Sequence, residues 1–167
     1  ARNRDVTITW SAPTVAPTTV SGYQVVDGAG ALRAWVNTRP GLTGKGNPLP
    51  NGVHLSEVRA PASGPIASCV EIAPRDVDEA WDDVRLSFAV KSVGSEEGAR
   101  RSAEAAARAL ANAVTTGLRG NPAVVTLPSG DVVRVLIAHS PQGPTMTGNV
   151  GGQVTYTFDA TFRCQPA

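Results

Sequence analysis

Cysteine and net charge are both scarce in this chain of 167 residues, and each shortage excludes a class of protein. The two cysteines, Cys69 and Cys164, are too few for a disulfide-stapled secreted domain. They belong to no Cys-x-x-Cys or Cys/His cluster, so we expect two free buried thiols and no zinc site. Fifteen basic and fourteen acidic residues leave a net charge of +1. This balance lacks the basic excess of a dedicated nucleic-acid-binding protein.

Long apolar runs are missing as well. The longest uncharged run, residues 6–26, is interrupted by two prolines and rich in Thr and Ser. A segment of this composition would span a bilayer poorly, so we expect no membrane partner.

The motifs of catalysis are also absent. The two histidines, His54 and His139, fall in different predicted strands, and no Gly-x-Ser-x-Gly elbow accompanies them. The glycine-rich run at 41–46 lacks the strand–loop–helix setting of a phosphate-binding loop. The acidic residues at 76–79 and 82–83 lack the spacing of a calcium loop and are predicted to be solvated. We therefore assign no catalytic, cofactor-binding or metal-binding residue and expect no enzyme and no cofactor.

One long helix is predicted over residues 95–118. Ser95 suits the N-cap, and the acidic residues 96–97 complement the positive end of the helix dipole. Apolar residues recur at three- and four-residue spacing and predict a buried stripe. We expect Gly117 and Gly120 to end the helix. The exposed face carries three arginines that could contact a partner: Arg100, Arg101 and Arg108.

Shorter elements surround this helix. A first helix is predicted over 27–38, and strands over 53–58, 66–73, 84–93, 123–127, 132–139 and 154–164. The strand at 84–93 alternates strictly, so one face should be core and the other should meet solvent or a partner. Residues 128–131 read as a hairpin tip, whose Ser129, Gly130 and Asp131 are further candidates for a partner contact. Residues 40–52 and 141–152 are predicted to be loops.

The order of these elements predicts an α+β fold with a mixed or antiparallel sheet of about five to six strands and two helices on one face. We expect a single domain over residues 27–167, preceded by an extended arm over residues 1–26. The arm carries Trp10 and Tyr23, which a solvated tail would not need. We therefore expect part of it to lie on its own domain or on a neighbouring copy.

From Asp27 onward, the chain resembles the tail terminator, or tail-completion, proteins of long-tailed bacteriophages. The matching features are an early helix with ALRAWV, a strand ending near Pro74, and the run DDVRLSFAVKSVGSEEGARRSAEAAARALANAV. A hairpin with a PSGD tip follows, and then an aromatic final strand that ends in FRC. The resemblance rests on element order and texture, because these proteins have no short catalytic signature. The long arm and the generous loops depart from the simple pattern.

The resemblance implies a structural virion protein, assembled in the host cytoplasm and located in the tail or neck. Such proteins form a ring, normally a homo-hexamer, on the head-proximal end of the tail tube. The ring stops polymerisation of the tail tube protein and presents a surface to a head-completion or connector protein. Genome DNA passes through its lumen without specific binding.

Three other functions remain open from the sequence. A head–tail connector or stopper protein of the neck is also small and ring-forming. A cellular ligand-binding α+β domain would be a monomer with a closed apolar pocket. A small enzyme is the third alternative, although the sequence offers no plausible triad or metal set.

Overall fold

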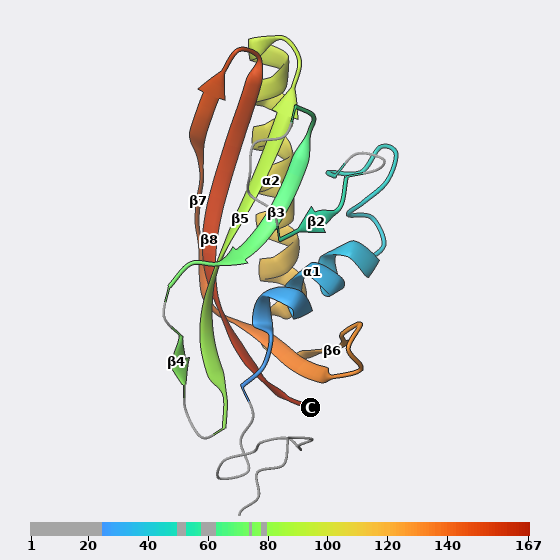
Figure 1. The fold of residues 1–167 in the computed structure, drawn as a ribbon, viewed down its shortest axis with the longest axis vertical. Helices are drawn as coiled ribbons and strands as arrows, with labels where there is room; N and C mark the ends of the chain where they lie inside the picture. The colour runs from blue at the N-terminus through green and yellow to red at the C-terminus, as the bar shows by residue number, and fades with distance from the viewer. Residues whose placement is uncertain (1–24, 50–52, 58–62, 74, 78–79) are drawn as a thin grey trace, which may run out of the picture.

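The chain folds around one curled mixed sheet with two helices against it (Figure 1), in a computed structural model that describes residues 25–49, 53–57, 63–73, 75–77 and 80–167. In chain order the elements are α1 (Gly28–Thr38), β2 (Leu55–Ser56), β3 (Ile66–Glu71), β4 (Asp76–Val77), β5 (Asp82–Val93), α2 (Glu96–Leu118), β6 (Ala123–Thr126), β7 (Val132–Val150) and β8 (Gln153–Pro166). The sheet order is β2-β3-β5-β8-β7-β6, and β4 pairs with β5 beside this path. Of these pairs β2–β3 is parallel and the others are antiparallel. The predicted α+β class with a mixed sheet is confirmed.

Both helices cover the same face of the sheet, as predicted. In Figure 1, α2 runs along β5, β8 and β7, and α1 lies beside the lower part of α2, near β2 and β6. The core between these layers is built on three aromatic rings, since Phe88 of β5 stacks on Phe158 of β8 at 4.7 Å and meets Phe162 edge-on at 5.9 Å. Every second residue of β8 from Val154 to Cys164 is buried, so the predicted alternation is confirmed.

The helix α2 begins and ends where the sequence predicts. The Ser95 hydroxyl accepts a hydrogen bond from the Gly98 amide at 3.2 Å, and Gly120 adopts a positive φ just beyond the end. The predicted stripe is buried: Ala103, Ala107, Leu110, Val114 and Leu118. Gly117, however, does not end the helix. A Cβ atom on it would lie 2.6 Å from the Trp35 ring, so glycine here lets α1 and α2 approach closely.

The helix α1 also closes one edge of the sheet. Asp27 caps it by accepting from the Gly30 amide at 2.9 Å. The Asn37 carboxamide donates to the Leu55 carbonyl at 2.9 Å and accepts from the Leu55 amide at 2.8 Å. The side chain thus pairs with β2 as a neighbouring strand would.

The prediction of a loop over residues 141–152 is wrong for most of these residues. β7 continues to Val150 and pairs with β8 until Val150 lies opposite Gln153. Four register shifts accommodate its prolines and glycines. Only Gly151 and Gly152 form the turn, and both have positive φ. Pairing with β8 therefore overrides a composition that favours loops.

One further expectation is wrong. The polar connection after β3 contains a short strand, β4, and the predicted solvated Asp82 is fully buried. On the outer face of β5, predicted to meet solvent or a partner, Ser87, Ala89 and Lys91 are each less than 10% exposed. Neighbouring strands on both sides shield these side chains.

Candidate interaction surfaces

The predicted basic face of α2 is a ladder of paired charges. Arg101 lies 2.6 Å from Glu97, and Arg108 lies 2.7 Å from Glu104. Arg100 approaches the same Glu104 at 3.7 Å. Contact with Tyr156 raises the pKa of Arg100, which is charged throughout the physiological range in any case. The face is exposed and strongly charged, with neighbouring arginine and glutamate side chains that a partner would meet together.

The predicted hairpin tip is an exposed turn that joins β6 to β7. The Leu127 amide donates to the Asp131 carbonyl at 2.8 Å, and Ser129 donates to the Asp131 carboxylate at 3.0 Å. Gly130 has φ +96°, a conformation that favours glycine. These bonds give the residues a local role in shaping the turn. The tip lies at one end of a cleft of about 450 Å³ against α1, which Ser129 lines together with Gly30 and Arg33.

The structure brings Arg100, Arg101 and Arg108 together on one helix and Ser129, Gly130 and Asp131 together in one turn. The two groups belong to different elements. Trp10 and Tyr23 fall outside the described residues, as does the rest of the arm up to residue 24.

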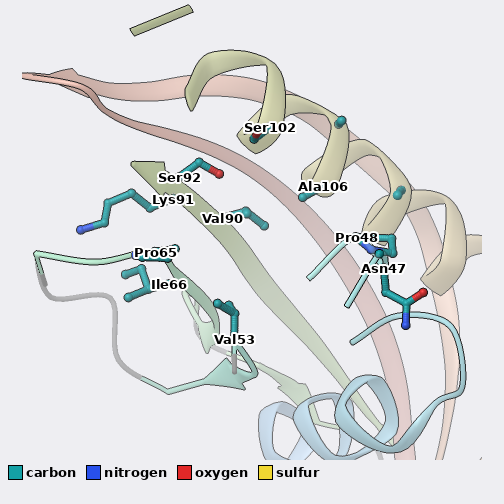
Figure 2. Close-up of a pocket in the computed structure, with 13 residues that line it drawn as sticks. Asn47, Pro48, Val53, Pro65, Ile66, Val90, Lys91, Ser92, Ser102 and Ala106 are labelled. Atoms are coloured by element: carbon teal, nitrogen blue, oxygen red, sulfur yellow. The ribbon is translucent and has the colours of Figure 1, made fainter. Parts of the chain in front are cut away.

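A groove of about 440 Å³ opens along the flank of α2 (Figure 2). Its walls are Ser102 and Ala106 of the helix, Val90 of β5, and Asn47 and Pro48 of the loop after α1. Lys91 and Ile66 line both this groove and a second depression, so the two spaces meet at these residues. Small helix side chains leave this space open.

A second depression of about 370 Å³, called here the sheet hollow, lies at the Gly151 end of the sheet. It is lined by Ile66, Ala89, Lys91, Gly148, Asn149, Val150, Gln153 and Thr155. Lys91 is only 7% exposed, and its ammonium donates to the Gln153 carboxamide at 3.2 Å. Val150 at the rim is 77% exposed, and Val93 of β5, on the other side of β8, is 45% exposed. An exposed apolar side chain at the rim of a hollow makes this end of the sheet a candidate contact site.

Sequence reasoning missed this hollow because it placed Val150 in a loop. One signal was present. The core positions of β5 are Val84, Leu86, Phe88 and Val90, so the alternation places Val93 on the opposite face. An apolar residue on that face, at the end of a strand, cannot be buried in the core.

The middle of the open sheet face is polar and its charges are paired. Arg85 of β5 lies 3.5 Å from Asp159 of β8, and Arg163 lies 3.0 Å from Asp83. The Arg163 guanidinium also covers the Trp81 ring at 4.4 Å. His139 lines a shallow pocket of about 280 Å³ beside Arg85 and Asp159. Charge pairing across strands leaves this face little net charge.

The titratable groups in and beside the core are held by contacts that stabilise the fold. Arg75 holds Glu71 through two bonds of 2.8 and 3.1 Å and Asp82 through one of 2.7 Å, and the bonds to Glu71 raise its pKa most. Burial raises the pKa of the Cys164 thiol to about 12, so this thiol stays protonated and unreactive. Cys69 and Cys164 are both buried and form no disulfide, as predicted. Within the described residues, His, Cys, Asp and Glu form no group of three or more that could hold a metal ion.

In the described part of the chain, neither helix is long and apolar enough to cross a bilayer. No family model and no curated protein matches this sequence.

Proposed function

We propose that this protein is a structural component of a phage virion that forms a ring, with six copies, at the head-proximal end of the tail tube. In this function it ends tube polymerisation and offers a surface to a head-completion protein. The proposal rests on the resemblance to tail terminator proteins and on one observation about the fold. That observation is the element order: an early helix, a long strand running into the Ala/Arg-rich helix, a hairpin, and an aromatic final strand.

The distribution of surface features supports a role in assembly. The sheet has a polar open face with paired charges, and apolar side chains are exposed at its ends. A ring lumen that lets DNA pass should not grip phosphates, and a face with balanced charge satisfies this requirement.

Light scattering coupled to size-exclusion chromatography tests the ring. Six copies of a 17.2 kDa chain give a mass of about 100 kDa, which the proposal predicts at high protein concentration. A 17.2 kDa monomer at every concentration, with no binding to tail tubes, would argue against it.

A further inference from the structure

Exposed valines lie at the two ends of β7, on the side of the sheet that faces away from the helices. Val132 is the first residue of the strand and Val150 is the last. Nineteen residues at about 3.3 Å each place these ends roughly 60 Å apart, or somewhat less because of the bulges. One molecule therefore carries two separate apolar surfaces.

The first surface is the sheet hollow, which Val150 lines at its rim. Val93 of β5 lies outside the lining but opposite the same Gln153 as Val150. A carboxylate stands next to it. Asn149, which lines the hollow, donates to Glu96 of α2 at 2.8 Å. Glu96 is exposed, so an incoming cation could reach it.

The second surface, called here the β6 patch, consists of Val124, Val132 and Arg134. Val124 is 60% exposed and lies opposite Arg134, while Val132 lies opposite Thr126. Their neighbours Val125 and Val133 are buried, so strand alternation directs the patch outward. Arg134 is exposed and forms no ion pair within the described part of the chain.

Pairing of strands between copies is disfavoured at two edges. The Asn37 carboxamide occupies both backbone groups of Leu55 on β2. Beyond Val135, β7 carries two prolines and four register shifts, which are devices that prevent edge-to-edge pairing. These two edges are therefore poor sites for association between copies, and the exposed valines offer other surfaces.

We propose that the sheet hollow of one copy receives the β6 patch of the next copy, with Arg134 placed opposite Glu96. This inference rests on the ring of the proposed function. A head-to-tail ring needs two different, complementary surfaces on each subunit, whereas a twofold dimer needs only one that complements itself. The two surfaces differ in this way: one is a hollow beside the Glu96 carboxylate, and the other is an outward patch that carries the Arg134 guanidinium.

The test uses two single variants of the full chain, Val124→Asp and Val150→Asp. Each spoils one surface and keeps the other, and both positions are exposed enough for the fold to tolerate the change. Light scattering should show that each variant alone is monomeric. A 1:1 mixture should form dimers, because one intact hollow and one intact patch remain. Val77→Asp, at a residue that is 50% exposed on β4, is the matched control and should assemble like the wild type.

Charge exchange gives a second, independent measurement. Glu96→Arg and Arg134→Glu should each raise the concentration needed for half-assembly by about tenfold, since like charges then face each other. The double variant should restore assembly.

The outcomes separate the inference from the function. If the wild type assembles and both aspartate variants assemble equally well, or if the mixture forms no dimer, the inference is overturned while the ring stands. A wild type that stays monomeric removes both. If head-to-tail dimers form as described but the protein does not cap tail tubes, the interface stands and the proposed function fails.

Discussion

Arg75 Nη1 lies 2.7 Å from Oδ2 of Asp82, a side chain with no exposed surface. The same nitrogen donates to the Val26 carbonyl at 2.7 Å, so one guanidinium joins the start of α1 to the start of β5. Removing one partner of a buried pair leaves the other charge uncompensated.

Arg75→Ala should therefore lower the free energy of unfolding by about 3–5 kcal/mol in urea titrations at neutral pH. The control is Arg101→Ala, which breaks an exposed pair on α2 and should cost about 0–1 kcal/mol. Equal effects of the two variants would mean that the buried pair has no special weight.

Gly117→Ala should destabilise the protein although alanine is the better helix former. The new Cβ would meet the Trp35 ring, and overpacking of this kind costs about 1–3 kcal/mol. Thermal unfolding measures the change. In a Trp35→Leu background the same substitution should cost less stability. If Gly117→Ala stabilised the otherwise wild-type protein, the close approach of the two helices would be refuted.

Stability should fall between about pH 9 and pH 12 because of Cys164. Burial raises its pKa from 9.0 to about 12, so the unfolded thiol loses its proton before the folded one does. The contribution is fully present below pH 9.0 and is lost as pH rises toward 12, by at most about 1.4 kcal/mol per pH unit. Chemical unfolding of the wild type and of Cys164→Ser across this range gives the difference. Parallel curves for the two proteins would contradict the prediction.

Reversing charge on α2 at Arg101 and Arg108 should weaken assembly while the monomer stays folded. Each substitution turns an i,i+4 ion pair into a repulsion, which costs the helix only about 0.5 kcal/mol. Circular dichroism checks the fold and light scattering checks the assembly. Arg119→Glu, an exposed position just beyond the helix, is the control. Normal rings from the double variant would mean that this face meets only solvent.

Local signals explain what the sequence predicts well. α1 and α2 have side-chain caps at Asp27 and Ser95 and apolar periodicity within a few turns, so their ends need no tertiary information. The final strand is equally legible, because its alternation continues over its whole length.

Long-range contacts explain what it predicts badly. The second half of β7 pairs with β8 along its length, and the buried Asp82 carboxylate is paired with Arg75. The sheet hollow combines residues from β3, β5, β7 and β8, so no single segment indicates it. The predicted contact residues of α2 and of the hairpin tip are located correctly on exposed elements, and their role stays a prediction.

The most direct test of the central proposal is electron microscopy of tail tubes assembled from the tube protein of the same virus, with and without this protein. We predict tubes that stop growing and carry a ring of density at one end, labelled by antibody against this chain. Tubes of unchanged length with bare ends would contradict the proposed function.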